Sequence, residues 1–436
     1  MKKDFLGNKS AIIGLVILLL IFAGFFISGI LRYKKAGESG SSLNYEVVNG
    51  YKFKISKLAD NIGSISRIRI TPDGSTMLVA TLSGNIIAFN KINGEFKRQD
   101  KPFFSLKTNL PGFPPRESGL SGLVFSADFE KSGDVFLLYS FLEDKDVLKN
   151  RITRVHFTKE KNEAYGEAPV LIFEGNTDSE TSHQIEGGVG VMVKGVSHLL
   201  FNVGDATKAD NAGDLKKEAG KVMLIQRDGS SPLGERPFPD YPKIQSINLR
   251  NAFDIAFNPY DPFKRFAIGD TGMDRFDRFL YLKIADLSGM PQKGLNLAWN
   301  GTEESLQLPV KDENISGSPE GVLYRWNPTE TVTDVVFYPG GTGGIPSSNA
   351  NESYVLLNVW GKTGSTDIQP GKKILLGKIS NLNGQPKLEI NDFIRRSEAG
   401  KGKLGHPLGL SVDETTGDLF FGDILEGSIY KVEPIK

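Results

Sequence analysis

Histidine side chains are the groups in this sequence best suited to proton transfer, because an imidazole titrates at roughly pH 6.5. The chain contains four: His156, His183, His198 and His406. His156 and His198 lie inside runs of β-forming residues, which indicates ordinary strand positions, whereas His406 precedes Pro407 at the start of the last such run, where it could face the axis. His183 instead precedes Gly187-Gly188 in a polar loop, where an imidazole can be aimed at a substrate hydroxyl as a general base. An ordinary loop residue is the alternative interpretation.

An arginine and an asparagine, Arg250-Asn251, begin another β-run with the sequence LRNAFDIAF. A guanidinium group binds a carboxylate or a similar anion through two parallel hydrogen bonds. Arg250 is therefore a candidate for binding an anionic group, and a surface arginine at the start of a strand is the alternative. The dipeptide alone does not decide between them.

Three aspartates, Asp270, Asp274 and Asp277, share the loop GDTGMDRFDRF. Carboxylate oxygens in a glycine-containing turn are hard ligands of the kind that hold calcium. The spacing differs from that of an EF-hand loop, and aspartates that cap turns are the alternative explanation. The sequence shows no zinc pattern of cysteines and histidines and no GxSxG motif.

The overall composition is that of an ordered globular protein with a large core: 436 residues, 39% hydrophobic and 24% charged. Lys plus Arg equals Asp plus Glu at 52 each, so no basic excess indicates a nucleic-acid partner. The absence of cysteine excludes disulfides and thiolate metal sites. The 49 glycines and 28 phenylalanines favour many short strands joined by tight turns.

One pattern recurs six times along the chain and organises these candidate residues. An apolar pair is followed by a polar turn rich in Asp, Pro and Gly, and then by four or five β-formers. The six copies carry the apolar anchors Ile70, Phe125, Val193, Phe257, Phe337 and Val412. Each interval between anchors is long enough for one four-stranded sheet and a variable loop.

Six such sheets predict an all-β fold, a six-bladed β-propeller over residues 45–436, since stacking around an axis buries both faces of each sheet. A pair of β-sandwiches is the alternative. We expect the strand YEVVNGYKFKIS (45–56) to complete the last blade beside residues 427–434 and so to close the ring. Loops near the axis are the expected position of a site.

The first part of the chain has a different character. Residues 11–31 are uncharged and apolar, long enough to span a bilayer as one helix and longer than the core of a cleaved signal peptide, which is the alternative. The predicted order is a short tail (1–9), a transmembrane anchor (10–31), a linker (32–44) and the propeller (45–436). We expect a single-pass membrane protein whose propeller is extracytoplasmic.

The ordered motifs resemble those of the glucose/sorbosone dehydrogenase family, which are sugar dehydrogenases that use pyrroloquinoline quinone (PQQ) and are built on a six-bladed propeller. The resemblance covers roughly residues 46–434. The segments that carry it, in the family's order, include GLSGLVFSADFEKSGDVFLLYS, RITRVHFT, HQ...GGVGV...LLFNVGDA, AGKVMLIQRDGSSPLGERPFP, LRNAFDIAFNP, GDTGMDRFD, GLNLAWN and HPLGLSVDETTGDLFFGDILEGSIYKVEP.

The resemblance implies roles for several residues. His183 would remove the proton from a sugar's anomeric hydroxyl while hydride passes to PQQ. Gln184, Arg250, Asn251 and Lys362 would contact the cofactor. Calcium, held by Asp270, Asp274 and Asp277, would polarise the quinone.

The leading hypothesis is therefore a membrane-anchored quinoprotein that oxidises an aldose or related sugar and passes electrons to an unidentified acceptor. Two alternatives stay open. One is a catalytically inactive propeller that binds carbohydrate or protein, because a fold alone does not imply function. The other is a metal-dependent hydrolase of the lactonase type on a similar propeller.

Overall fold

The computed structural model describes residues 43–110, 117–144, 147–177, 181–233, 236–283, 294–308, 311–312, 321–361, 372–382, 385–397, 400 and 405–435. The chain divides into the units Met1–Leu43 and Asn44–Lys436, and every element described below belongs to the second unit. The predicted anchor, residues 10–31, lies outside the described residues. No helix within the described ranges is long and apolar enough to cross a bilayer.

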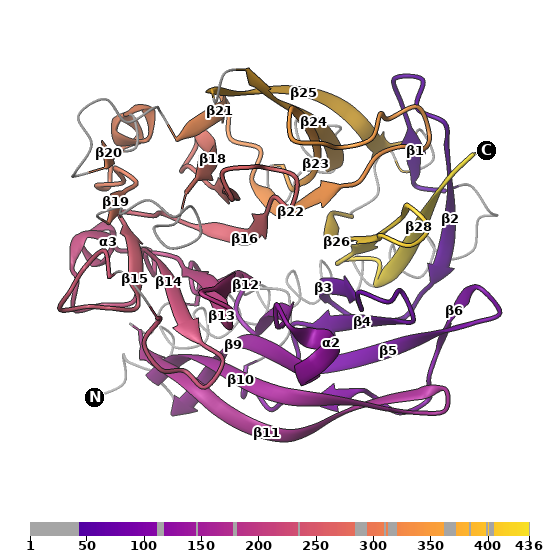
Figure 1. The fold of residues 1–436 in the computed structure, drawn as a ribbon, viewed down its shortest axis with the longest axis horizontal. Helices are drawn as coiled ribbons and strands as arrows, with labels where there is room; N and C mark the ends of the chain where they lie inside the picture. Colours follow the sequence, from indigo (N-terminus) through magenta and orange to yellow (C-terminus); the bar gives the residue numbers. More distant parts are fainter. Residues whose placement is uncertain are drawn as a thin grey trace, which may run out of the picture. The chain divides into compact units, whose positions relative to one another are not determined.

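Six sheets, antiparallel except for the parallel pair of β15 and β19, surround a common centre in the unit Asn44–Lys436, as Figure 1 shows. The innermost strands β3, β8, β12, β16, β22 and β26 each contact the next one, and β26 returns to β3, so the ring is closed. The predicted six-bladed β-propeller is confirmed. We number the blades 1 to 6 in chain order.

The first three blades contain the following strands. Blade 1 has β3 (Ile65–Ile70), β4 (Thr76–Thr81), β5 (Asn85–Ile92), β6 (Glu95–Arg98) and β7 (Phe104–Ser105). Blade 2 has β8 (Leu120–Phe125), β9 (Asp134–Asp144), β10 (Val147–Glu160) and β11 (Glu163–Asn176). Blade 3 has β12 (Ile185–Val193), β13 (Val196–Val203), β14 (Lys221–Gln226), β15 (Ile244–Ile247), β19 (Leu295–Asn296) and β20 (Lys311–Asp312).

The other three blades complete the ring. Blade 4 has β16 (Ala252–Phe257), β17 (Phe266–Asp270), β18 (Asp277–Leu282) and β21 (Val322–Trp326). Blade 5 has β22 (Val332–Tyr338), β23 (Glu352–Val359), β24 (Lys373–Leu382), β25 (Gln385–Arg396) and β1 (Tyr45–Val47). Blade 6 has β26 (Pro407–Asp413), β27 (Asp418–Asp423), β28 (Ser428–Pro434) and β2 (Phe53–Ala59). The short helices are α2 (Phe129–Ser132), α3 (Ala209–Gly213) and the 3-10 helix η1 (Glu303–Gln307).

The six apolar anchors of the sequence repeat all lie on innermost strands, one in each blade. This placement explains the pattern: a hairpin turn rich in Gly, Asp and Pro follows the innermost strand, and the β-formers after the turn make the second strand. The repeat therefore predicted both the number of blades and their inner edges.

The ring closes through β2, the second strand of the described chain. This strand pairs with β28 in blade 6. This confirms the predicted closure for the second half of the segment 45–56. The first half differs from the prediction, because β1 pairs with β25 in blade 5. Asn49 and Gly50, with φ of 59° and 76°, form a left-handed turn that redirects the chain between the two strands.

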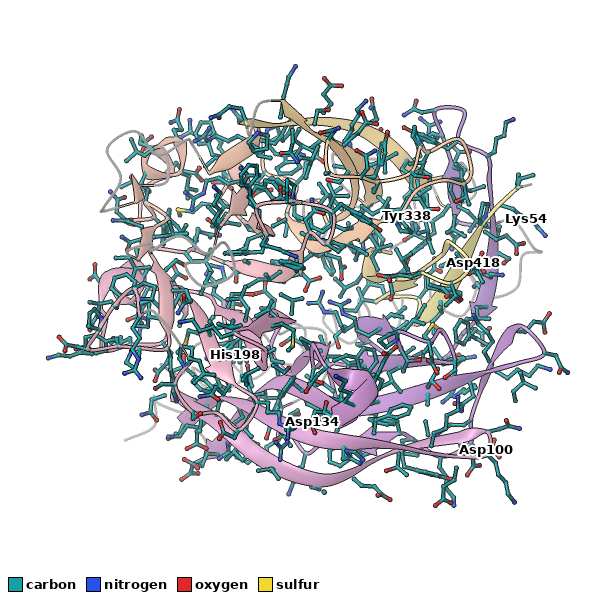
Figure 2. All side chains as sticks on the ribbon, in the orientation of Figure 1. Lys54, Asp100, Asp134, His198, Tyr338 and Asp418 are labelled. Carbon is teal, nitrogen blue, oxygen red and sulfur yellow. The ribbon has the colours of Figure 1, made fainter. Side chains whose placement is uncertain are left out.

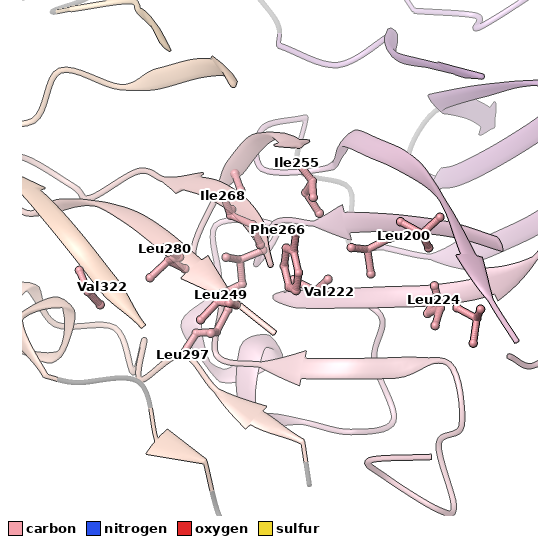
Figure 3. Close-up of a cluster of buried hydrophobic side chains, with 14 residues drawn as sticks. Leu200, Val222, Leu224, Leu249, Ile255, Phe266, Ile268, Leu280, Leu297 and Val322 are labelled. Atoms are coloured by element: carbon pink, nitrogen blue, oxygen red, sulfur yellow. The ribbon is translucent and has the colours of Figure 1, made fainter. Parts of the chain in front are cut away.

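Hydrophobic side chains fill the spaces between neighbouring blades. Figure 3 shows the cluster between blades 3 and 4, in which Leu200 and Val222 pack with Ile268 and Leu280. Similar clusters lie between blades 1 and 2, 2 and 3, 4 and 5, and 6 and 1. Burial of both faces makes each blade a rigid support for the residues that its innermost strand presents to the axis.

Candidate functional site

Every innermost strand carries a β-bulge near its beginning, where one extra residue interrupts its pairing with the second strand. A bulge bends a strand and redirects a side chain. The residues at the bulges are Ser66, Ser121, Glu186 with Gly187, Phe253 with Asp254, Thr333, and Gly409 with Leu410. Five of the blades thereby direct a bulge residue into one central pocket: Ser66, Ser121, Glu186, Phe253 and Thr333 line it.

The central pocket has a volume of about 300 Å³ and an uneven lining. One wall is apolar and consists of Leu82, Trp360, Leu408 and Ile424. The rest of the lining is mostly polar and includes His183, Glu186, Arg250, Asn251 and Thr271. A ligand with one flat apolar face and a polar edge matches this arrangement.

His183 lies in the loop before β12 and lines the pocket, as its sequence position predicted. Its backbone is left-handed, with φ of 56°, so the loop turns sharply at this residue. Its Nδ1 lies 2.7 Å from Oδ1 of Asp205, and a carboxylate can only accept, so Nδ1 carries the proton. The other ring nitrogen, Nε2, has no hydrogen-bond partner within the described ranges and is available as a base.

Asp205, which the sequence analysis did not assign a role, fixes the orientation of His183. It is buried, and its Oδ2 accepts a hydrogen bond of 2.8 Å from the indole of Trp299. Its Oδ1 also accepts from the backbone of Thr207 at 2.9 Å. The available signal was the Gly-Asp pair that ends the run 183–205, but nothing in the sequence places that strand end beside the loop of His183.

Arg250 and Asn251 also line the pocket, next to His183. One guanidinium nitrogen of Arg250, Nη1, donates to the carbonyls of Thr271 and Gly272 at 2.8 Å each. Its Nε and Nη2 have no hydrogen-bond partner in the described part of the chain, so the group, which lies over the ring of Trp299, can still bind an anion. Asn251 is 2% exposed, and its Oδ1 is a buried acceptor without a donor among the described residues.

Gln184 does not face the pocket, in contrast to its expected contact with a cofactor. Its side chain is buried, and its Oε1 accepts from Asn150 at 3.0 Å. Its Nε2 donates to the carbonyl of Ser182 at 3.1 Å. Because consecutive residues near a strand point in opposite directions, Gln184 turns into the blade when His183 turns to the axis. Lys362, another expected cofactor contact, lies outside the described residues.

The three aspartates of the loop 269–279 do not converge as a metal site. Asp270 is buried, with Oδ2 facing Arg278 and Oδ1 accepting from the backbone of Arg250 and Asn251. Asp277 accepts three backbone hydrogen bonds and one from a hydroxyl, and Asp274 is exposed. Within the described ranges, no group of three or more His, Asp or Glu side chains could hold a metal ion. The turn-capping alternative accounts for Asp270 and Asp277.

Arg67 also lines the pocket, although it was not among the predicted site residues. From β3 its Nη1 reaches across the axis to Asp334 in blade 5 at 2.6 Å and to Asp254 in blade 4 at 3.4 Å. It also donates to backbone carbonyls of Ser121 and Phe253. This buried network ties blades 1, 2, 4 and 5 together. The run ISRIRI contains the arginine but does not reveal that its side chain crosses the axis.

Two further histidines have structural roles. His198, labelled in Figure 2, is buried in blade 3, where Nε2 accepts from the backbone of Leu233 at 3.2 Å. His406 stacks on Trp360 with ring centroids 4.0 Å apart, and burial lowers the pKa of His406 to about 4. His406 is therefore neutral near neutral pH and supports the apolar wall of the pocket.

Comparison with known proteins connects this geometry to a family. The profile described as Glucose / Sorbosone dehydrogenase matches residues 65–344. Curated protein sequences gave no significant match. The fold matches the soluble aldose sugar dehydrogenase of Escherichia coli in its apo form, with 17% identity, a TM-score of 0.63, and coverage of 88% of this chain and 100% of that one.

Two other solved structures match at similar levels. The PQQ-bound form of the aldose sugar dehydrogenase of Streptomyces coelicolor has 16% identity and a TM-score of 0.57, over 89% of this chain and 100% of that one. The calcium structure of a carbohydrate-active enzyme of Trichoderma reesei has 14% identity and a TM-score of 0.56, over 91% of this chain and 100% of that one. At these identities the solved structures establish the shared fold.

Proposed function

Because the chain belongs to the glucose/sorbosone dehydrogenase family, we propose that it oxidises the anomeric hydroxyl of an aldose or related sugar and uses PQQ as the hydride acceptor. The observation that carries this proposal is His183 in the central pocket, with its Nδ1 held by Asp205 and its Nε2 open to a ligand. A base, an orienting carboxylate and a pocket are the protein's share of such a reaction.

The pocket fits PQQ on two grounds that the chain itself provides. PQQ is flat, carries three carboxylates, and has one pyrrole N–H. The unpaired Nε and Nη2 of Arg250 suit an anionic oxygen, and the orphaned Oδ1 of Asn251 suits an N–H donor. Arg250 and Asn251 would hold the cofactor, and the indole of Trp360 belongs to an apolar wall suited to a flat ring.

The chain's own residues then perform the proton transfer. His183 Nε2 accepts the proton of the anomeric hydroxyl, and Asp205 stabilises the resulting imidazolium through the hydrogen bond at Nδ1. PQQ, when bound, supplies the redox chemistry by accepting the hydride from the anomeric carbon. The sugar would lose one hydride, which carries two electrons to the quinone, and one proton, which passes to Nε2 of His183, so the products are the lactone and the reduced quinone.

Calcium does not fit the set of residues first expected to hold it. Both oxygens of Asp270 and both of Asp277 already accept hydrogen bonds or an ion pair, as described above. We therefore derive no step through a metal at these aspartates. The same observation gives no support to the hydrolase alternative, which needs a metal-binding set.

Membrane anchoring is part of the proposal and rests on the sequence. Residues 11–31 are apolar and uncharged over a length that spans a bilayer. The propeller would stand outside the cytoplasm on the linker 32–44. Extraction of membranes with alkaline carbonate should leave the chain in the pellet, and protease added to intact cells or spheroplasts should reach the propeller; release by carbonate would refute the anchor.

Activity is tested on the full-length chain in detergent with PQQ, calcium, a panel of aldoses and an artificial electron acceptor. We expect sugar-dependent reduction of the acceptor and a change in the PQQ absorption spectrum. If neither occurs, the enzyme proposal fails and the carbohydrate- or protein-binding propeller takes its place.

A further inference from the structure

The bulge of blade 3 places an acidic side chain in the central pocket. Ile185 pairs with Val203 and Gly188 with Phe201, so β12 has one residue more than β13 between these pairs. Glu186 lies in this bulge, lines the pocket and is 4% exposed. The next residue, Gly187, has no space for a side chain, because a Cβ there would lie 2.4 Å from Cα of Asp254. The bulge therefore packs its backbone against blade 4 and presents the carboxyl group to the axis.

Glu186 differs from the bulge residues that other blades contribute to the pocket. Ser66, Ser121 and Thr333 carry hydroxyls, and Phe253 is apolar. Among the five bulge residues that line the pocket, Glu186 is therefore the one that carries a carboxyl group. The nearest strong cation, Arg67, is already paired with Asp254 and Asp334.

The lining that blades 4 and 5 contribute to the pocket contains buried polar atoms that lack a partner. Oδ1 of Asn251, Oγ1 of Thr271 and Oγ1 of Thr333 are buried and have no hydrogen-bond partner in the described part of the chain. All three residues line the pocket, and Asn251 and Thr333 are each 2% exposed. Buried polar atoms are normally paired, so their lack of partners indicates a ligand with several hydroxyl or N–H groups.

We propose that the carboxyl group of Glu186 hydrogen-bonds one hydroxyl of a polyol in the central pocket and so determines which sugar the pocket accepts. This inference deepens the proposed function and rests on it. A site that hydrogen-bonds a particular hydroxyl discriminates strongly against the analogue without it, because the buried carboxyl then loses that hydrogen bond.

The protonation of Glu186 supports this role. Burial, followed by the negative charge of Glu117, raises the pKa of Glu186 well above its ordinary value, although Arg67 and a hydrogen bond with Ser121 oppose the shift. A protonated carboxyl donates and accepts at once, which complements a sugar hydroxyl that does the same. The charged or titratable groups around it are Arg67 from β3, Glu117 before β8, Asp254 from β16, and His183 ahead of the bulge.

A cation is the other ligand that a carboxyl group attracts. The described residues contain no group of three acidic or histidine side chains arranged for a metal ion. The orphaned atoms of the pocket lining include two hydroxyls, which donate as well as accept. The lining therefore favours a polyol.

The test is a double-mutant cycle, in which a substitution of Glu186 is combined with the removal of one hydroxyl from the sugar. Binding of an aldose and of each of its monodeoxy analogues is measured by calorimetry on the full-length chain supplied with PQQ, for the wild type, Glu186→Gln and Glu186→Ala. In the wild type, one deoxy position should weaken binding by about tenfold or more. In Glu186→Ala that penalty should fall to about threefold or less, while the penalties at other positions persist.

Two controls make the cycle specific. Glu95→Gln changes an exposed glutamate in blade 1 and should leave every penalty unchanged. We expect wild-type affinity for the sugar to decline with rising pH, as Glu186 loses its proton. Glu117→Gln removes a nearby negative charge, so this decline should occur at a lower pH, while the deoxy penalty stays. In Glu186→Gln the amide still donates and accepts, so affinity should be retained and its decline with rising pH should disappear.

The outcomes separate this inference from the proposed function. If sugars bind or are oxidised but Glu186→Ala keeps every deoxy penalty of the wild type, the role of Glu186 is refuted and the proposed function stands. If no sugar binds the wild type, the proposed function fails and the inference fails with it. Thermal melting of both variants shows whether a loss of binding reflects unfolding. If Glu186→Ala does not fold, the pH dependence of binding in Glu186→Gln decides whether Glu186 has this role.

Discussion

Oδ1 of Asp205 lies 2.7 Å from Nδ1 of His183, although the two residues come from opposite ends of the segment 183–205. The hairpin of β12 and β13 brings them together, because Ile185 pairs with Val203 at the open end of the hairpin. A buried carboxylate on one ring nitrogen fixes the tautomer and makes the other nitrogen the base. His183 and Asp205 together therefore provide a base and the group that orients it.

The first prediction concerns this pair. His183→Asn should lower the turnover number about 10²–10⁴-fold, because it removes the base. Asp205→Asn should lower it at least tenfold with little change in KM, because the amide neither orients the ring as firmly nor stabilises its protonated form. Steady-state kinetics with saturating PQQ measure both effects. His156→Asn, an exposed histidine in β10, is the control, and unchanged turnover in His183→Asn would remove His183 from the mechanism.

The second prediction concerns cofactor binding by Arg250. Arg250→Lys keeps a positive charge but loses the planar donor set, so the Kd for PQQ should rise about tenfold or more, with a larger rise in Arg250→Met. Quenching of tryptophan fluorescence during PQQ titration gives the Kd, since Trp360 lines the pocket. Arg227→Lys, on a half-exposed arginine outside the pocket, is the matched control. Equal affinity of Arg250→Met and wild type would show that Arg250 does not bind the cofactor.

The third prediction concerns the buried ion pair of Arg278 and Asp270. Both side chains are fully buried, and Oδ1 of Asp270 also holds the backbone of Arg250 and Asn251. Arg278→Met leaves the carboxylate without its counter-ion and should lower the free energy of unfolding by about 3–5 kcal/mol. Urea unfolding measures this. The double variant with Asp270→Asn should recover part of the loss, and a loss below about 1 kcal/mol in Arg278→Met would contradict the assignment.

The fold was predictable from the sequence because it depends on a repeated local pattern. Each anchor, such as Ile70 or Phe337, marks one innermost strand and the turn after it, so six anchors indicate six blades. The closing strand was predictable only in part. Its second half has the alternation of a strand, whereas the left-handed turn at Asn49-Gly50 that sends Tyr45 to blade 5 leaves no signal in that alternation.

The site was less predictable because its partners lie far apart in the sequence. His183 and Arg250 were identifiable from residue type and local context. The role of Arg67 depends on Asp254 and Asp334 across the axis, and the role of Glu186 depends on a bulge whose extra residue appears only in the strand pairing. Asp270 was expected to bind calcium because its position in a turn was visible, while its neighbour Arg278 was not known to fold back onto it.

The fourth prediction concerns the pH dependence of stability at the closure of the ring. Asp423, in β27, accepts a hydrogen bond of 2.7 Å from Tyr45, the first residue of β1, and lies 3.4 Å from Nη1 of Arg396. Burial, and then the charge of Glu426, raises the pKa of Asp423 from 3.8 to about 6. Between these values the folded chain holds a proton that the unfolded chain has lost, so the contribution of Asp423 makes stability fall as pH rises through this window.

Asp423→Asn removes this titration and isolates it from the other acids that titrate in the same range. We expect the free energy of unfolding of the variant, relative to wild type, to be more favourable at pH 7 than at pH 4 by on the order of 1–3 kcal/mol. Urea unfolding of both proteins at the two pH values gives this difference directly. The variant loses hydrogen bonds at both pH values, so its absolute stability does not enter the comparison. A difference that is equal at pH 4 and pH 7 would mean that Asp423 titrates alike in the folded and unfolded chains.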